Sequence, residues 1–238
     1  MVSKKKTLGI SHTELNEIKP ITENQKEVFE SYKKGQNLFL YGVAGTGKTF
    51  VALYNALKDV LDPKSPRERV YIVRSLLPTR DIGFLPGDEE DKSYLYQVPY
   101  QNMVRFMFKR GSDAEFDRLY TDLRNQGTID FLSTSFLRGI TIDNGVIIVD
   151  ECQNLNFHEL DTIMTRVGQD TRIVFAGDIQ QTDLTKTNDR NGILDFVNIM
   201  QQMKEVDCIE FNLGDIVRSG MLKSYLIEKI KLGLHYEQ

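Results

Sequence analysis

Short apolar runs alternate with longer stretches of helical period along most of the chain. The runs are rich in β-branched and aromatic side chains, a composition typical of strands that are buried on both faces of a sheet. They lie at residues 37–41, 69–73, 129–132, 145–149, 172–176 and 208–211. Helices are predicted at residues 22–34, 49–61, 97–110, 113–125, 157–167, 190–203 and 219–232. This alternation predicts an α/β fold in which a parallel sheet is flanked by helices on both faces.

Residues 1–19 fall outside this alternation. They are polar and carry three consecutive lysines, so we expect a loose arm or the edge of a short hairpin. The first helix is predicted to begin near Thr22, because Thr22 and Gln25 have the spacing of a capping box. No repeat, low-complexity tract or linker divides the rest of the sequence, and we expect residues 20–238 to form a single domain.

Composition restricts the classes of function. The 238 residues include 30 basic and 34 acidic side chains, a formal net charge of −4, which excludes a generally basic nucleic-acid coat but allows a local basic groove. No apolar run reaches the roughly 18 residues of a membrane-spanning helix, and the lysines near the start are not followed by the apolar segment of a signal peptide. With two cysteines and three scattered histidines, we expect free thiols, no zinc site and a cytoplasmic location.

The segment after the first apolar run fits the phosphate-binding pattern G-x-x-x-x-G-K-[ST]. Its glycines let successive backbone N–H groups surround phosphate oxygens, and the helix that follows adds the positive end of its dipole. We expect Lys48 to reach the β- and γ-phosphates and Thr49 to bind magnesium through its hydroxyl. A plain glycine turn is the alternative, but the match at every fixed position between a strand and a helix favours a phosphate loop. The predicted nucleotide-binding residues here are Gly42, Val43, Ala44, Gly45, Thr46, Gly47, Lys48, Thr49 and Phe50.

Two acidic residues, Asp150 and Glu151, directly follow the apolar run at 145–149. Open α/β sheets bind their ligands at the carboxyl ends of the strands, which is where these side chains are predicted to lie. We expect Asp150 to hold magnesium through water and Glu151 to orient or deprotonate an attacking water. An apolar strand that ends in two acids is a weak signal alone, and the phosphate loop upstream makes it a strong one.

Two further polar residues extend the predicted catalytic set. Gln181 follows the run at 172–176, where a glutamine can sense the γ-phosphate or hold the attacking water, and a plain polar turn is the alternative. Arg218 stands at the start of the last predicted helix. There it is predicted to stabilise the transition state as an arginine finger, and a surface arginine is the alternative.

Together these motifs resemble those of PhoH-family P-loop ATPases over about residues 20–225. The resemblance is carried by the phosphate loop, by the stretches 82–88, 138–139, 150–154 and 215–218, and by Gly177, Asp178, Gln181, Asp183 and Leu184. Cys152, Ile179 and Ser219 stand where the family usually has alanine, proline and histidine, beside the proposed catalytic side chains. The resemblance implies a single RecA-like core, related to superfamily 1 helicases, that binds and hydrolyses ATP and has a role in RNA metabolism.

The likeness to helicases implies a role for Gln25 and a subunit arrangement. In such enzymes a glutamine upstream of the phosphate loop contacts the adenine edge, which Gln25 is predicted to do; a surface glutamine is the alternative. Too few residues follow Glu151 for the second RecA-like domain of such a motor. We therefore expect Arg218 to enter the nucleotide site of the next subunit in a head-to-tail homo-oligomer, by analogy a hexameric ring. The alternative is a monomer in which Arg218 acts in cis or lies on the surface.

The sequence thus predicts a magnesium-dependent ATPase coupled to RNA or single-stranded nucleic acid. A slow nucleotide-binding switch or oligomeric scaffold is one alternative, and a P-loop kinase is another, although the acidic pair suits the activation of water better than phosphoryl transfer to an acceptor. Aromatic and basic residues also gather between residues 94 and 110. A stacking platform for nucleic acid is one interpretation, and the packing of most of these rings in a helical core or a subunit contact is the favoured one.

Overall fold

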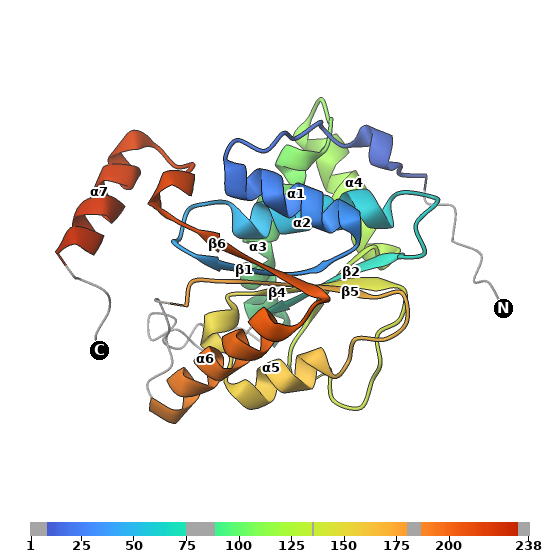
Figure 1. Cartoon of the computed structure of the whole chain (residues 1–238). Coiled ribbons are helices and arrows are strands. Elements are labelled where there is room, and N and C mark those ends of the chain that lie inside the picture. Colours follow the sequence, from blue (N-terminus) through green and yellow to red (C-terminus); the bar gives the residue numbers. More distant parts are fainter. Residues whose placement is uncertain (1–8, 75–88, 135, 180–186, 233–238) are drawn as a thin grey trace.

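The computed structural model describes residues 9–74, 89–134, 136–179 and 187–232, and its centre is a six-stranded sheet (Figure 1). The strands lie in the order β3-β2-β4-β5-β1-β6, and every pair of neighbours is parallel. Their bounds are β1 (Asn37–Gly42), β2 (Arg69–Arg74), β3 (Ile129–Leu132), β4 (Gly145–Asp150), β5 (Arg172–Gly177) and β6 (Val206–Phe211). Each predicted strand is present, and the expected α/β fold is confirmed.

Helices cover both faces of this sheet, with α1 to α4 on one face and α5 and α6 on the other (Figure 1). Their bounds are α1 (Glu23–Lys34), α2 (Lys48–Val60), α3 (Glu89–Met107), α4 (Asp113–Asn125), α5 (Phe157–Met164), α6 (Thr187–Gln202) and α7 (Gly220–Lys231). Three short 3-10 helices are η1 (His12–Glu14), η2 (Cys152–Asn154) and η3 (Leu213–Asp215). None of the helices in the described ranges has the length and apolar character that a membrane crossing needs. The described layers are those of a RecA-like core.

The ends of α1 follow local chemistry, with one departure from the prediction. The Thr22 hydroxyl accepts a hydrogen bond from the backbone N–H of Gln25, and Gly35 ends the helix in the left-handed region at φ 98°. The side chain of Gln25 does not complete the capping box, because its Oε1 accepts from the N–H of Ile21 rather than from that of Thr22. The side-chain amide of Gln25 therefore makes its hydrogen bonds with residues outside the helix.

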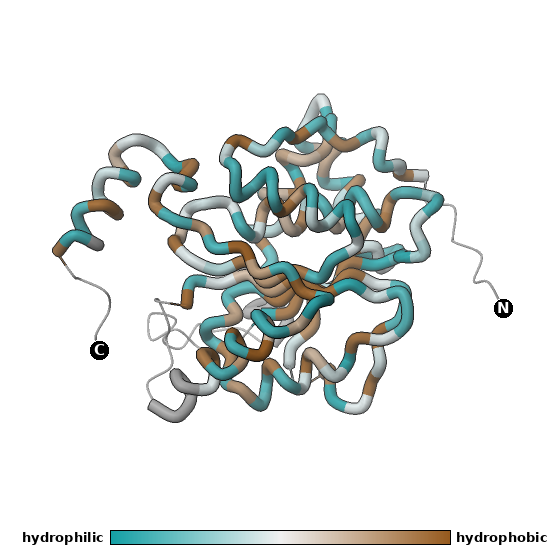
Figure 2. Tube along the Cα trace, viewed as in Figure 1, coloured by the Kyte–Doolittle hydropathy of each residue, from teal (hydrophilic) through white to brown (hydrophobic). Residues whose placement is uncertain are grey.

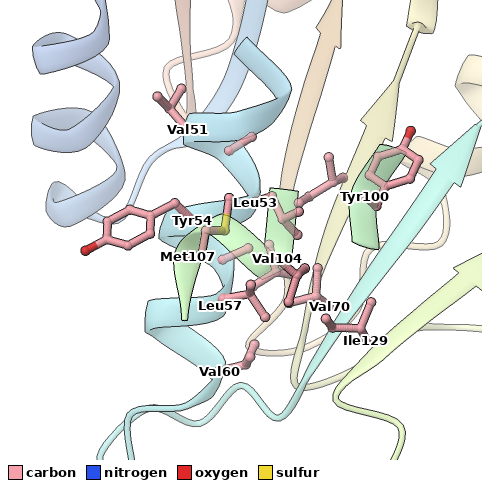
Figure 3. Packing of buried hydrophobic residues seen from close by; sticks show 14 of the residues in the cluster. Val51, Leu53, Tyr54, Leu57, Val60, Val70, Tyr100, Val104, Met107 and Ile129 are labelled. Atoms are coloured by element: carbon pink, nitrogen blue, oxygen red, sulfur yellow. The ribbon is translucent and has the colours of Figure 1, made fainter. Parts of the chain in front are cut away.

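Alternate side chains of the central strands enter two separate hydrophobic clusters. Val146 and Ile148 of β4 belong to the cluster beneath α1 to α4, whereas Ile147 and Val149 belong to the cluster beneath α5 and α6. Figure 2 shows the hydrophobic residues concentrated along these strands, and Figure 3 shows side chains of α2 and α3 packed against strand residues of the first cluster. Burial on both faces accounts for the uninterrupted apolar runs in the sequence.

The described part of the N-terminal segment is not a loose arm, and that expectation is wrong for residues 9–19. Ile10 and Leu15 are buried in the cluster beneath α1 to α4. Leu15 also forms an isolated antiparallel bridge with Phe108, just after the end of α3. The physical reason is that a few apolar side chains, widely spaced among polar ones, anchor this segment on the helices.

Candidate nucleotide-binding site

The predicted site residues meet at one edge of the sheet. Since β4, β5 and β1 are adjacent and parallel, their carboxyl ends lie side by side. The phosphate loop follows β1, the acidic pair lies at the end of β4, and Asp178 follows β5. This edge is where open α/β sheets bind their ligands.

The phosphate loop has a backbone that only glycine adopts easily at three positions. Gly42, Gly45 and Gly47 have φ values of 111°, 78° and 83°, all in the region that disfavours other residues. At Gly42 a Cβ atom would lie 2.1 Å from the carbonyl oxygen of Phe211, so a side chain there is also sterically excluded. Gly47 then leads into α2, whose first turn presents its N–H groups toward the loop.

The ammonium group of Lys48 is held inside this loop. Its Nζ donates to the carbonyl oxygens of Gly42 and Val43, each at 2.8 Å, and Lys48 is only 8% exposed. Burial lowers the pKa of Lys48, and nearby carboxylates oppose that shift. These carboxylates belong to Asp178, Glu151 and Asp150. The loop thus holds the Lys48 ammonium group close to these carboxylates. A lysine at this place in the loop can bind the phosphate groups of a nucleotide.

Thr49 and Asp150, the two predicted metal-binding residues, are in direct contact. The Thr49 hydroxyl donates to Oδ1 of Asp150 at 2.6 Å, and the Tyr100 hydroxyl donates to Oδ2 at 2.6 Å. Burial, reinforced by Asp150, raises the pKa of Tyr100, so this phenol stays a hydrogen-bond donor. A hydroxyl and a carboxylate are hard oxygen ligands that fit magnesium, which takes only one or two protein groups when phosphates supply the others. In the described ranges no cluster of three or more His, Cys, Asp or Glu side chains is suited to a metal ion.

Glu151 has an unusual backbone and a fixed side chain. Its φ and ψ of 52° and 41° place it in the left-handed region, which costs a residue other than glycine about 1–3 kcal/mol. Oε2 of Glu151 accepts a hydrogen bond from Nε2 of Gln153 at 2.6 Å, and Oε1 of Gln153 accepts from the N–H of Asp178 at 3.0 Å. Gln153 therefore links the predicted base to the end of β5. A strained backbone, with a side chain fixed by a hydrogen bond, is typical of a residue at a functional site.

Cys152, next to Glu151, is buried completely. Burial raises the pKa of its thiol well above the ordinary value, so the thiolate needed of a nucleophile does not form near neutral pH. A Cβ atom on Gly177 would lie 2.7 Å from the Cys152 sulfur, which shows how tightly the two strand ends pack. Cys152 is therefore a buried packing residue of the hydrophobic cluster beneath α5 and α6.

Gln25 lies against the phosphate loop, with both ends of its amide in hydrogen bonds. Nε2 donates to the carbonyl oxygen of Thr46 at 3.0 Å, and Oε1 accepts from the N–H of Ile21 at 3.0 Å. The side chain is only 4% exposed, so it is not the surface glutamine of the alternative interpretation. Its contact with adenine stays a prediction, and would require these two hydrogen bonds to be exchanged for ones to the base.

Arg218 lies beside the phosphate loop of its own chain. A Cβ atom on Gly45 would be 3.1 Å from Cγ of Arg218, and the N–H of Val217 donates to the carbonyl oxygen of Gly45 at 3.1 Å. Upstream, Nδ2 of Asn24 donates to Oδ2 of Asp215 at 2.7 Å and ties this segment to α1. Arg218 is exposed, and the aliphatic part of its side chain lies against the loop of its own chain, as the cis alternative requires. Its predicted role in the nucleotide site of a neighbouring subunit stays a prediction.

The remaining predicted features lie outside the described residues or in and just after α3. Gln181 and the stretch 82–88 are not among the described residues. Between residues 94 and 110, Tyr100 and Phe108 are buried, whereas Phe106 is 67% exposed. Arg105 pairs with Asp113 and Asp117, and Arg110 with Glu14. Tyr100 and Phe108 thus belong to the core, as favoured, and two of the basic side chains are neutralised by carboxylates.

A family model described as PhoH-like protein matches residues 17–229. The chain belongs to the PhoH family. Protein PhoH2 of Bacillus subtilis (strain 168) is 35% identical over 159 residues, which cover 66% of this chain and 35% of that protein. A PhoH-like protein of Mycobacterium tuberculosis (strain ATCC 25618 / H37Rv) is 30% identical over 217 residues, which cover 91% of this chain and 59% of that protein.

Among solved structures, the large terminase of a thermophilic bacteriophage, in complex with ADP, is similar over 92% of this chain and 51% of that one. The TM-score is 0.49 and the sequence identity 11%. This PhoH-family chain spans 35% of PhoH2 and 59% of the mycobacterial relative, so it corresponds to part of each.

The site of this PhoH-family chain is a P-loop nucleotide-binding site, and most of the residues that the sequence motifs single out lie close together in it. The phosphate loop, Asp150, Glu151, Gln25 and Arg218 all lie at one edge of the sheet. The sequence does not predict the contact of Tyr100 with Asp150. No local signal reveals it, because the two residues are far apart in the chain and meet only when α3 packs on the sheet.

Proposed function

We propose that this PhoH-family protein is a magnesium-dependent ATPase in which Glu151 activates the attacking water. The observation that carries the proposal is the hydrogen bond of Thr49 to Asp150, with the fixed Glu151 carboxylate next to it and Lys48 in the adjoining loop. A phosphate-binding loop alone suits many proteins. Asp150 and Glu151 lie beside the loop with their carboxylates held by hydrogen bonds, and such an acidic pair suits hydrolysis.

Each residue of the site has a role in this reaction. Backbone N–H groups of the loop and the ammonium of Lys48 bind the phosphate oxygens of ATP. Thr49 and Asp150 would hold magnesium, which when bound would neutralise negative charge on the phosphates. Glu151 accepts a proton from water on its carboxylate while Gln153 holds Oε2 in place. Oxygen attack on the γ-phosphorus then breaks its bond to the bridging oxygen and releases ADP and phosphate.

We propose that Arg218 acts in cis on the charge that develops during this reaction. Its position beside Gly45 of the same chain supports this assignment. We expect Arg218→Ala to lower turnover, and mixing this variant with Glu151→Gln to restore no activity, because each site then lacks one of the two residues. The measurement is phosphate release from the mixed, co-incubated variants, with each variant mixed with the parental protein as a control. Activity that returns on mixing the two variants would instead place Arg218 in a neighbour's site.

We also propose that hydrolysis is coupled to RNA or single-stranded nucleic acid, as the PhoH resemblance implies. The expected result is an ATP turnover that rises as single-stranded RNA is added at low salt and that loses this response at high salt, because phosphate contacts release counterions. Parallel titrations with single-stranded DNA compare the two nucleic acids. A rate that neither nucleic acid changes would favour the slow switch or scaffold.

Three further expectations from the sequence stay predictions. They are a single domain over residues 20–238, a cytoplasmic location and a homo-oligomer such as a hexameric ring. A P-loop kinase remains the alternative reaction, and it is distinguished by transfer of the γ-phosphate to an acceptor instead of release as phosphate.

A further inference from the structure

A buried tyrosine of α3 contacts the carboxylate that is predicted to hold magnesium. Tyr100 is 2% exposed, and its ring packs against Phe131 at a centroid distance of 5.4 Å. In Figure 3 it lies at the edge of the labelled cluster, with its hydroxyl pointing away from the other side chains. That hydroxyl donates to Oδ2 of Asp150 at 2.6 Å.

The hydroxyl is not needed for packing. A phenylalanine would bury the same ring without placing a polar group inside the protein, where an unpaired hydroxyl is costly. Tyr54, on the same side of the sheet, satisfies its hydroxyl with a backbone group, because the hydroxyl donates to the backbone oxygen of Asn16. Tyr100 instead donates to a side chain of the nucleotide site.

The contacts of Asp150 divide its two oxygens between two helices. Oδ1 accepts from Thr49 at the start of α2, and Oδ2 accepts from Tyr100 in α3. Asp150 is itself buried, so little solvent competes for either oxygen. With Oδ2 held by Tyr100, the carboxylate turns Oδ1 toward Thr49, the other predicted metal-binding group.

We propose that Tyr100 is a positioning residue that orients Asp150 for the magnesium–nucleotide complex. The inference rests on the proposed function, since it assumes that Asp150 serves magnesium. Partners that hydrogen-bond to metal-binding groups fix their orientation, and losing one typically lowers metal affinity by about 10–100-fold. Magnesium is sensitive to such a loss because it demands a nearly ideal octahedral geometry.

Tyr100→Phe tests this role, because it removes the hydroxyl and keeps the buried ring. We measure the binding of a fluorescent ATP analogue, first in EDTA and then as magnesium is added. The expected result is unchanged affinity in EDTA and a magnesium midpoint raised by about tenfold. Tyr54→Phe is the matched control, since it removes a buried hydroxyl whose partners are backbone atoms, and its magnesium midpoint should equal that of the parental protein.

A second comparison separates positioning from a general loss of structure. If Tyr100 acts through Asp150, adding Tyr100→Phe to an Asp150→Asn variant should not raise the magnesium midpoint further. An unchanged midpoint in Tyr100→Phe alone, an equal loss of affinity with and without magnesium, or additive effects in the double variant would each overturn the proposal. Because the readout is binding, a parental protein that binds magnesium and nucleotide without hydrolysis would contradict the ATPase proposal and leave this test valid.

Discussion

Glu151→Gln is expected to bind ATP as the parental protein does and to hydrolyse it at least about a hundredfold more slowly, within the range usual for the loss of a catalytic base. The amide keeps the shape of the side chain, and its oxygen can still accept the hydrogen bond from Gln153. It cannot accept the proton of the attacking water. Single-turnover phosphate release measures the chemical step, and titration with a fluorescent ATP analogue measures binding.

The matched control is Glu30→Gln, which makes the same chemical change on the exposed surface of α1. It should hydrolyse ATP at the parental rate. If Glu151→Gln also did so, the assignment of Glu151 to water activation would be wrong. If Glu151→Gln lost nucleotide binding instead, the carboxylate would serve the loop rather than the reaction.

Lys48→Ala is expected to abolish turnover and to weaken ATP binding. The ammonium is the cation held inside the phosphate loop, and a hydrogen bond to a charged partner contributes about 1.5–3 kcal/mol, which corresponds to a loss of affinity of roughly ten- to a hundredfold. Calorimetric titration with ATP gives the affinity, and phosphate release gives the rate. Lys58→Ala, at the exposed far end of the same helix, is the control.

The same variant also reports on the loop itself. Nζ of Lys48 donates to the carbonyl oxygens of Gly42 and Val43, so alanine leaves these groups without that partner. Thermal unfolding of the variant without nucleotide therefore shows how far the loop depends on the lysine. Parental ATP affinity and turnover in Lys48→Ala would contradict the assignment of this segment as a phosphate loop.

The sheet could be predicted from the sequence because its strands are buried on both faces and therefore appear as uninterrupted apolar runs. The start of α3 at Glu89, well before the predicted residue 97, was missed because its first turns lack a clear apolar period and Pro99 interrupts the pattern. The packing of residues 9–19 was missed for a related reason. Ile10 and Leu15 are too widely spaced to form a periodic pattern, and tertiary contacts alone fix them.

The phosphate loop was predictable because its backbone geometry depends on glycines that are close in the sequence. The contact of Tyr100 with Asp150 depends on how α3 packs and leaves no local pattern. For Arg218, the sequence predicted a role in the nucleotide site of the next subunit, and that role stays a prediction. The approach of its side chain to Gly45 is the basis of the cis role proposed above.

The reaction proposed for this site is the hydrolysis of ATP with magnesium. The direct measurement is phosphate release from ATP by the parental protein, with magnesium or with EDTA, beside the Glu151→Gln variant prepared in the same way. We expect the parental protein to release free phosphate only with magnesium, at least about a hundredfold faster than Glu151→Gln, and to leave no phosphorylated acceptor. Release no greater than that of the variant, or a γ-phosphate recovered on an acceptor, would contradict it.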